Sequence, residues 1–271
     1  MLEVDYVSGK TRIYGIVGHP IEQVRSPEMF TASFKSRRAE AILLPFHVLP
    51  ADFDRVVPSL MLMPNLDGLI FTIPFKPQAM ALADVIGPNA RIVGAINALA
   101  RQAGGGWKGE IFDGIGCVEG FRKNGHSFAG KRVMLIGAGG AGSAIGVAVA
   151  HEGPASIRLF DPDSGRAQDL MHKIRQVDPA IAVVCAEPDC DGIDILLNAS
   201  PVGMLDDARM PISVERFDPK LVVFDAIVKP EMTPLLQLAA QSGCSFIQGR
   251  QMMLGQISKM TDYFGIPAAA L

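Results

Sequence analysis

The sequence is poor in the residues that build disulfide frameworks and metal centres. Its 271 residues include four cysteines, five histidines and one tryptophan. The cysteines form no C-x-x-C pair, and no histidine stands four residues from another or near a cysteine at zinc-finger spacing. We therefore expect reduced thiols and no bound metal ion.

Long apolar runs and basic clusters are also missing. No apolar run approaches the length of a membrane span, and the first stretch, MLEVDYVSGKTR, lacks the features of a secretory signal. The net charge is −3 and the lysines and arginines are scattered, which excludes a basic surface for nucleic acid or anionic lipid. We expect a cytoplasmic monomer or homodimer that binds a small molecule, with no nucleic acid and no membrane partner.

What the chain does contain is an alternation of apolar, β-rich runs with helix-like segments. It is 49% hydrophobic and 20% charged, which suits a soluble protein large enough for two cores. The alternation predicts an α/β fold with mostly parallel sheets covered by helices. Strands are expected at residues 11–18, 42–49, 67–74, 96–102, 106–113, 131–137, 156–161, 193–204 and 221–228. Helices are expected at residues 26–40, 51–62, 78–87, 114–125, 233–243 and 251–265, and directly after a glycine turn at 137–142.

The stretch LIFTIPFKPQA, residues 69–79, places a lysine where a helix is expected to begin. Pro77 favours the first turn of that helix, and the helix dipole opposes a cation such as Lys76 at its N-terminus. Stability alone would favour an acidic residue there. A solvated surface lysine is the alternative that the residues by themselves leave open.

The stretch KRVMLIGAGGAGSAIG has the order strand, glycine turn and helix that a dinucleotide-binding unit requires. Gly137 permits the tight turn, Gly139 lets the backbone approach a pyrophosphate, and Gly142 allows the helix to pack closely on the strand. The phosphates would lie at the helix N-terminus. In this context the GxGxxG pattern indicates a cofactor site rather than a turn without a ligand.

An acidic residue follows the next strand. Asp161 stands where the dinucleotide fingerprint expects an acid that binds the ribose hydroxyls, and its charge would repel a 2′-phosphate. NAD is therefore favoured over NADP, although Arg166 lies nearby and Asp161 could simply be a turn residue before Pro162. We expect Asn198, Ala199 and Ser200, at the carboxyl end of a later strand, to border the cofactor.

Taken together, these stretches resemble the shikimate dehydrogenase family over essentially the whole chain. Seven motifs occur in the family's order: GHPIEQVRSP, TIPFK, GAINA, FDGIG, GAGGAG, NASPVGM and GRQMMLGQ. The resemblance implies a substrate-binding domain, residues 1–112 with 250–271, and a Rossmann domain, residues 113–249. It also implies that the last helix returns to the substrate domain and that a cleft between the domains holds the chemistry.

The resemblance further assigns roles to individual residues. Lys76 and Asp113 correspond to the family's catalytic pair, in which the lysine exchanges a proton with the substrate hydroxyl. The expected helix would favour the neutral amine of Lys76, whereas Asp113 would favour the ammonium and fix its position. The resemblance implies substrate contacts by Ser26, Thr72, Asn97 and Gln256. It implies cofactor contacts by Gly137, Ala138, Gly139, Gly140, Ala141, Asp161, Asn198, Ala199, Ser200, Val202, Val228, Gly249 and Met252.

Several positions depart from the family's pattern. Val24 replaces the first serine of a Ser-x-Ser pair that binds the substrate carboxylate, and Val228 stands where a substrate-contacting tyrosine is usual. Apolar or small residues also replace polar ones at four further positions: Ile70, Ala98, Ile111 and Phe112. A site that lacks hydroxyl-binding groups discriminates strongly against a hydroxyl-rich substrate, so we expect poor turnover of shikimate. The alternative is that groups such as Arg25 bind the carboxylate and that shikimate remains the substrate.

The nucleotide half departs in one further way. NADP-using members carry N-R-T after the second Rossmann strand, whereas this chain has Asp161, Pro162 and Asp163. The leading interpretation is an NAD-dependent dehydrogenase acting on the secondary alcohol of a cyclic hydroxy acid: shikimate, quinate or a less polar analogue. An NAD-binding sensor or regulator with vestigial catalysis is the alternative, and the retained Lys76 and Asp113 argue against it. TIPFK, FDGIG and GRQMMLGQ together disfavour a methylene-folate dehydrogenase, and the absence of a G-x-S-x-G elbow disfavours acyl transfer.

Overall fold

The computed structural model describes residues 7–266 and contains two compact units. Within that range, one unit comprises the residues up to Phe112 together with those from Ile257 onward, and the other is Asp113–Gln256. The last helix, α8 (Gly249–Tyr263), contains the second boundary. The sequence placed that boundary at residue 250, near the start of this helix.

The first unit is built on a mixed sheet. Its strand order is β2-β1-β3-β5-β6-β4, and β1 pairs in parallel with β2 and β3, whereas β5 is antiparallel to β3 and β6. The strands are β1 (Arg12–Gly18), β2 (Ala41–His47), β3 (Leu66–Phe71), β4 (Val85–Ile86), β5 (Ala98–Arg101) and β6 (Trp107–Glu110). The helices are α1 (Ser26–Ser36), α2 (Phe53–Met61) and α3 (Pro88–Val93), with 3-10 turns η2 (Pro50–Asp52) and η3 (Gln78–Leu82).

Helices α1 and α2 each bury an apolar face that contains phenylalanine. Pro27 stands in the first turn of α1, where a proline costs no hydrogen bond, and Phe30 and Phe34 are buried. The ring of Phe34 lies 4.8 Å from that of Tyr14, which points from β1 into the same core. Helix α2 forms despite Pro58, as the sequence predicts, and buries Phe53.

The prediction of a helix directly after Lys76 is wrong. The chain forms only the short 3-10 turn η3, becomes extended at Ala83, and pairs as β4 with β6. Asp84 N donates to Trp107 O over 2.8 Å, and Asp84 Oδ2 accepts from Trp107 N over 2.7 Å. These bonds to a strand distant in sequence override the helical pattern. Lys76 therefore does not precede an α-helix, and the expected effect of a helix dipole on its amine is absent.

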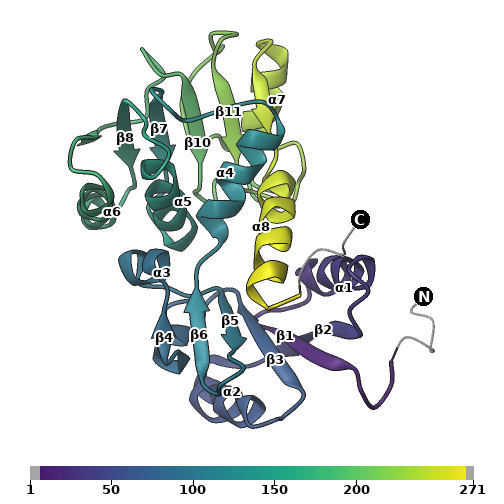
Figure 1. Ribbon diagram of the computed structural model, residues 1–271. Coiled ribbons are helices and arrows are strands. Elements are labelled where there is room, and N and C mark those ends of the chain that lie inside the picture. The colour runs from purple at the N-terminus through teal and green to yellow at the C-terminus, as the bar shows by residue number, and fades with distance from the viewer. Residues whose placement is uncertain (1–6, 267–271) are drawn as a thin grey trace. The chain divides into compact units, whose positions relative to one another are not determined.

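The second unit is a parallel sheet with the strand order of a dinucleotide-binding fold. The strand order is β12-β11-β10-β7-β8-β9. From β7 the chain adds β8 and β9 on one side and then β10, β11 and β12 on the other, and such sheets bind ligands at the switch point between β7 and β10. Figure 1 shows β7, β8, β10 and β11 side by side. The strands are β7 (Arg132–Ile136), β8 (Ser156–Phe160), β9 (Ala182–Cys185), β10 (Ile195–Asn198), β11 (Val222–Asp225) and β12 (Ser245–Ile247).

Helices pack on both faces of this second sheet. They are α4 (Asp113–Lys123), α5 (Gly140–Ala150), α6 (Ser164–Val177), α7 (Pro234–Gln241) and the first part of α8. Residues of β7 alternate between two cores: Val133 and Leu135 belong to one, and Met134 and Ile136 to the other. A strand buried on both faces reads as a continuous apolar run, which is why the sequence reveals β7 clearly. The α/β class with two domains is confirmed.

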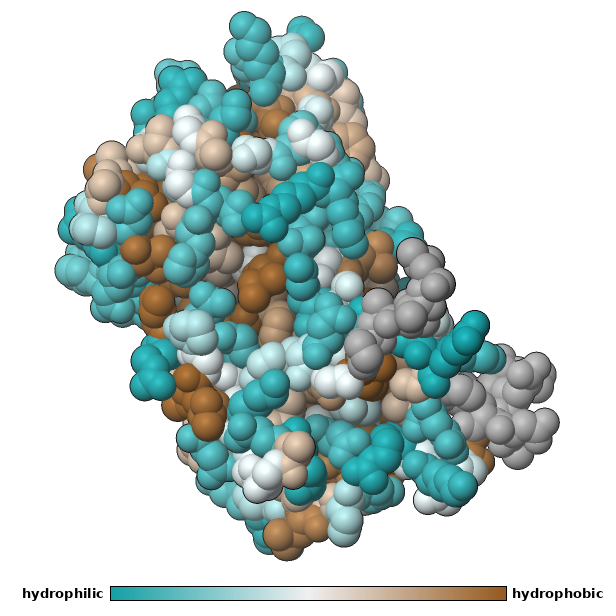
Figure 2. Space-filling view, viewed as in Figure 1, coloured by the Kyte–Doolittle hydropathy of each residue, from teal (hydrophilic) through white to brown (hydrophobic). Residues whose placement is uncertain are grey.

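On the face seen in Figure 2, apolar side chains occur in patches among hydrophilic ones. Large apolar side chains that are exposed include Leu62, Ile73 and Val228. Within the described part of the chain, no helix is both long and apolar enough to cross a membrane.

Candidate active site

The glycine turn follows β7 with the geometry that its pattern predicts. Gly137 has φ +97°, and a Cβ there would lie 2.7 Å from the carbonyl carbon of Ala199. A Cβ on Gly142 would lie 1.9 Å from the carbonyl oxygen of Gly137. By contrast, a Cβ on Gly139 or Gly140 would meet nothing within 4 Å, so the backbone at the start of α5 faces open space. This exposed backbone is suited to an anionic group such as a pyrophosphate.

Asp161 is tied to this turn. Its Oδ2 accepts a hydrogen bond from Ala138 N over 2.8 Å, and its Oδ1 accepts one from Asp163 N over 2.9 Å. The carboxylate therefore orders the glycine turn and its own turn together. Each oxygen has a second lone pair with which it can accept a ribose hydroxyl, so the structural role and the cofactor role are compatible.

Asp163 contacts Arg166, the residue whose positive charge made the preference for NAD over NADP less certain from the sequence. Its side chain caps α6 by accepting from Gly165 N over 3.0 Å, and it forms an ion pair with Arg166 over 3.4 Å. Both members of that ion pair are largely exposed. Arg166 thus has a carboxylate partner two residues after Asp161.

The other predicted cofactor residues lie at the carboxyl edge of the same sheet or on the adjacent helix. Asn198 ends β10, and its Oδ1 accepts from Ser200 N over 3.0 Å. Val228 follows β11 and is 38% exposed. Gly249 begins α8, and a Cβ there would lie 2.5 Å from the carbonyl oxygens of Ala226 and Ile227. Ala141 lies in the first turn of α5 and Val202 in the loop after β10, whereas Met252 packs into one of the two cores.

Asp113 and Gln256 are brought together within the second unit, although they are far apart in sequence. Asp113 begins α4 and is 5% exposed, and it accepts a hydrogen bond from Gln256 Nε2 over 3.1 Å. Two glycines permit this contact. A Cβ on Gly116 would lie 2.4 Å from Gln256 Cγ, and a Cβ on Gly255 would lie 2.5 Å from Gly116 O. Close packing of α4 on α8 therefore positions the amide on the carboxylate.

Lys76, Thr72 and Asn97 belong to the first unit and lie on linked backbone segments. Thr72 follows β3, and its N–H donates to Val17 O over 3.0 Å. Lys76 is half-buried, and its carbonyl oxygen accepts from Ile96 N over 2.9 Å. The backbone therefore ties the TIPFK segment to β1 and to the GAINA segment.

Asn97, in the GAINA segment, is buried and forms hydrogen bonds through both its side chain and its backbone. Its Oδ1 accepts from Phe112 N over 2.9 Å, and its carbonyl oxygen accepts from Phe71 N over 3.0 Å. Asn97 thus fixes the backbone of the residue that directly precedes Asp113. Its side-chain oxygen has a structural partner in addition to any role with substrate.

Ser26 is the first residue of α1, and the N-cap residue before it makes no side-chain cap of that helix. The neighbouring Arg25 forms an ion pair with Glu28, and both side chains are largely exposed. Arg25 therefore has a competing partner for the carboxylate-binding role that remained open in the sequence.

Two buried acids were missed by sequence reasoning. Glu110 ends β6 and accepts hydrogen bonds from Ala90 N over 2.7 Å and from Ile111 N over 2.8 Å. Asp225 ends β11 and is wholly buried. Asp225 ends an apolar strand, VVFD, whereas Glu110 ends the mixed strand WKGE, whose sequence does not mark it as buried. Burial raises the pKa of each carboxyl, and backbone hydrogen bonds oppose that shift in both.

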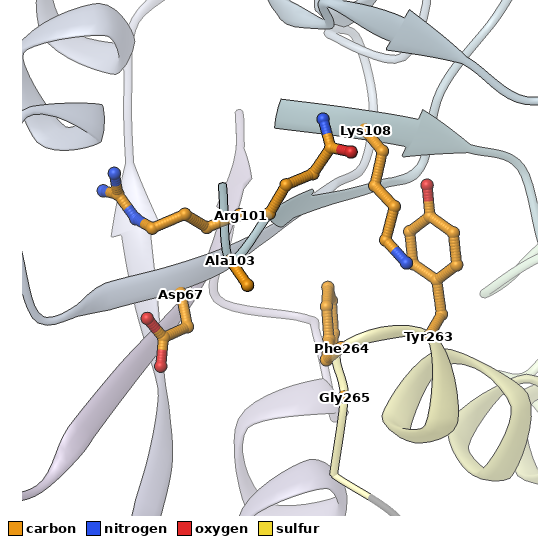
Figure 3. Close-up of a pocket in the computed structure, with 8 residues that line it drawn as sticks. Asp67, Arg101, Ala103, Lys108, Tyr263, Phe264 and Gly265 are labelled. Carbon is orange, nitrogen blue, oxygen red and sulfur yellow. The ribbon is translucent and has the colours of Figure 1, made fainter. Parts of the chain in front are cut away.

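A cavity of about 480 Å³ in the first unit contains none of the predicted site residues. It lies at the end of β3 opposite Thr72, and Figure 3 shows two of its lining residues side by side, with the end of the Lys108 side chain beside the Tyr263 ring. The Lys108 ammonium lies 4.4 Å from the centre of that ring, and Arg101 donates to Met61 O and Met63 O. Its charged groups already have protein partners. Among residues 7–266, no group of three or more histidine, cysteine or acidic side chains could hold a metal ion.

The fold and the glycine turn define an α/β protein with a dinucleotide-binding unit. Comparison with known proteins specifies it further: a family model described as the shikimate dehydrogenase substrate binding domain matches residues 16–99. A curated protein named shikimate dehydrogenase (NADP(+)), from Rubrobacter xylanophilus, is 31% identical over 94% of this chain and 91% of its own length. The chain therefore belongs to the shikimate dehydrogenase family, and it is an oxidoreductase of the shikimate/quinate dehydrogenase type.

Solved structures agree over nearly the whole chain. Shikimate 5-dehydrogenase from Listeria monocytogenes, in complex with shikimate and NAD, is 28% identical with a TM-score of 0.89, covering 99% of this chain and 96% of that one. Quinate dehydrogenase from Corynebacterium glutamicum, in complex with NAD, is 25% identical with a TM-score of 0.84, covering 94% and 93%. A nicotinamide dinucleotide is therefore the cofactor class.

Proposed function

We propose that this protein transfers a hydride between NAD and a secondary alcohol of a cyclic hydroxy acid: shikimate, quinate or a less polar analogue. The observation that carries the proposal is the hydrogen bond from Gln256 to Asp113. This bond joins Asp113, to which the family resemblance assigns a catalytic role, with Gln256, to which the resemblance assigns a substrate contact. A binding protein without catalysis would not need the amide, the buried acid and the lysine of TIPFK together.

In this proposal Lys76 and Asp113 act as a proton-transfer pair. When bound, NAD accepts the hydride that leaves the alcohol carbon. The neutral amine of Lys76 takes the hydroxyl proton in the same step, so the products are a ketone, NADH and an ammonium on Lys76. In the reverse direction the ammonium returns the proton to the oxygen. Asp113 orients Lys76, and Gln256 holds Asp113 in one conformation.

The preference for NAD is supported by the two acids after β8. Asp161 would place a negative charge at the ribose, where it repels a 2′-phosphate, and Asp163 pairs with Arg166. An arginine that already has a carboxylate partner is a poorer ligand for a second anion. The Rubrobacter relative is named for NADP(+), so cofactor preference separates this chain from that protein in our proposal.

The apolar replacements support a substrate less polar than shikimate. Ile70 and Ala98 are opposite partners on β3 and β5, and both are buried. Phe112 is also buried, with its ring 5.1 Å from that of Tyr263. Because these side chains offer no hydrogen bond, a substrate with fewer hydroxyls leaves fewer polar groups unpaired.

Initial rates test the proposal. Shikimate and quinate would each be supplied with NAD or NADP, and the formation of reduced cofactor would be followed. We expect turnover with NAD to exceed turnover with NADP. NAD binding without oxidation of either acid would favour a less hydroxylated substrate or the sensor alternative, and screening cyclic hydroxy acids with fewer hydroxyls separates these two. Faster turnover with NADP would contradict the cofactor assignment.

A further inference from the structure

Asp225 is a buried carboxylate that joins three segments of the second unit. It ends β11 opposite Asn198, which ends β10, and both residues are 0% exposed. Its Oδ1 accepts from Asn198 Nδ2 over 3.1 Å and from Ile227 N over 3.0 Å. Its Oδ2 accepts from Thr233 Oγ1 over 2.7 Å. Each of these donors is uncharged.

Such a carboxylate is costly. A buried charge without a cation is stabilised only by its hydrogen bonds, and an apolar residue of similar size would pack at this position without that cost. The acid is therefore better explained by what it orders than by its contribution to stability.

The ordered group is the amide of Asn198. Asp225 Oδ1 accepts from Ile227 N, so this oxygen faces Asn198 as an acceptor and Asn198 presents its NH₂ group to it. Asn198 Oδ1 then faces the other way and accepts from Ser200 N over 3.0 Å and from Ser200 Oγ over 2.7 Å. Ser200 Oγ in turn accepts from Val202 N over 3.3 Å. One carboxylate thus sets the orientation of an amide and of the loop that follows it.

This loop contacts the glycine turn. A Cβ on Gly137 would lie 2.7 Å from both Ala199 C and Ser200 N. A rotation of the Asn198 amide would therefore displace backbone that is in van der Waals contact with the turn. Asp225 reaches this contact through the hydrogen bond that it accepts from Asn198, the residue directly before Ala199.

We propose that Asp225 is a positioning residue for the dinucleotide: through the Asn198 amide it fixes the Ala199–Ser200 backbone against Gly137 and so shapes the surface that receives the cofactor. The inference rests on the proposed function in that it takes this edge as the cofactor site. Asp225 itself does not touch the cofactor, so its effect is on binding geometry and not on proton transfer.

Fluorescence titration with NADH, without substrate, tests the inference in the full-length protein at a temperature where circular dichroism shows each variant to be folded. For Asp225→Ala we expect the Kd of NADH to rise about tenfold, while kcat at saturating NAD changes by less than about threefold. Asp225→Asn restores binding, because its side-chain oxygen can still accept from Asn198 and Ile227. If Asp225→Ala does not fold, Asp225→Ser replaces it, since serine is too short to reach Asn198, and the same rise is expected.

Thr233→Ala is the matched structural control. It removes the partner of Asp225 Oδ2 and the cap of α7, where Thr233 Oγ1 accepts from Leu236 N, but it leaves the bond from Asn198 to Asp225. We expect a lower midpoint of thermal unfolding and an unchanged Kd of NADH. The inference is overturned if Asp225→Ala binds NADH like wild type, or if Thr233→Ala weakens binding equally. A wild-type protein that binds neither NADH nor NADPH overturns both the inference and the proposed function.

Discussion

The amide of Gln256 lies 3.1 Å from the carboxylate of Asp113 and donates a hydrogen bond to it. This contact depends on Gly116 and Gly255, where any side chain would collide with the facing helix. Asp113 begins α4 and is almost fully buried, so its carboxylate is held by the packing of two helices. In the proposed mechanism, an acid held in this way loses little entropy when substrate binds.

Loss of the Gln256 amide should lower the rate of catalysis without changing the affinity for the cofactor. For Gln256→Ala we expect kcat/KM for the hydroxy acid to fall about 10- to 100-fold, the range for a lost hydrogen bond to a charged group. The Kd of NADH should stay within about twofold. Gln241→Ala, at an exposed position on α7, serves as the control. Equal values of kcat/KM in the two variants would remove Gln256 from the site.

The glycine turn offers a matched pair of variants. In Gly142→Ala the new methyl lies 1.9 Å from Gly137 O, so we expect the free energy of unfolding to fall by about 1–3 kcal/mol or more. In Gly139→Ala the methyl meets no protein atom, so stability is kept while NADH binding weakens, because the methyl projects where the pyrophosphate would lie. Urea unfolding and NADH titration together measure both effects. Normal NADH binding by Gly139→Ala would place the pyrophosphate elsewhere.

Cofactor preference should shift when the two acids after β8 are neutralised. The double variant Asp161→Asn with Asp163→Ser removes the repulsion of a 2′-phosphate and releases Arg166 from its ion pair. We expect the ratio of kcat/KM with NADP to that with NAD to rise at least about tenfold. Asp169→Asn with Glu215→Gln, at two exposed positions of the second unit, removes the same number of negative charges and is the control for net charge. If both variants give the wild-type ratio, Asp161 is only a turn residue.

Glu110 should make stability depend on pH in a defined direction. Burial raises the pKa of its carboxyl above the usual value, so the folded state binds more protons than the unfolded state between the two pKa values. The contribution of Glu110 to stability is therefore present below about pH 4.3, its unfolded pKa, and is lost as pH rises through the folded pKa.

Comparison with Glu110→Gln isolates this dependence. We expect the free energy of unfolding of wild type, minus that of the variant, to decrease as pH rises from about 4.5 to 7.5. The changed hydrogen bonds of glutamine add a constant offset and leave this slope unaffected. Urea unfolding at several pH values gives the difference directly. A difference that increases with pH would show that the backbone N–H groups lower the pKa more than burial raises it.

Local patterns in the sequence predicted the fold of the second unit, because the signals for its glycine turn are local. The glycine turn, the strand before it and the helix after it lie within one short stretch, and the geometry at Gly137 and Gly142 follows from their lack of a side chain. The segment after Lys76 shows the limit of such reasoning. Its residues suit a helix, but Asp84 pairs with Trp107 in a strand that the sequence places much later.

The buried acids were missed for the same physical reason. Asp225 acquires its role from Asn198 and Thr233, and the first of these lies on a neighbouring strand rather than in the same segment. A single sequence does not reveal which strand ends will be neighbours. The contact between Asp113 and Gln256 likewise depends on helix packing through glycines, which the motifs FDGIG and GRQMMLGQ contain without indicating that they meet.

The proton-transfer role of Lys76 is tested most directly by Lys76→Ala, with the faster of the two acids, saturating NAD and Lys10→Ala as the exposed control. We expect kcat to fall about 10²- to 10⁴-fold, the range for loss of a general base, while the Kd of NADH changes by less than about twofold. Added primary amines should restore part of the lost rate. A Lys76→Ala variant that oxidises the acid at the wild-type rate would contradict the proposed mechanism.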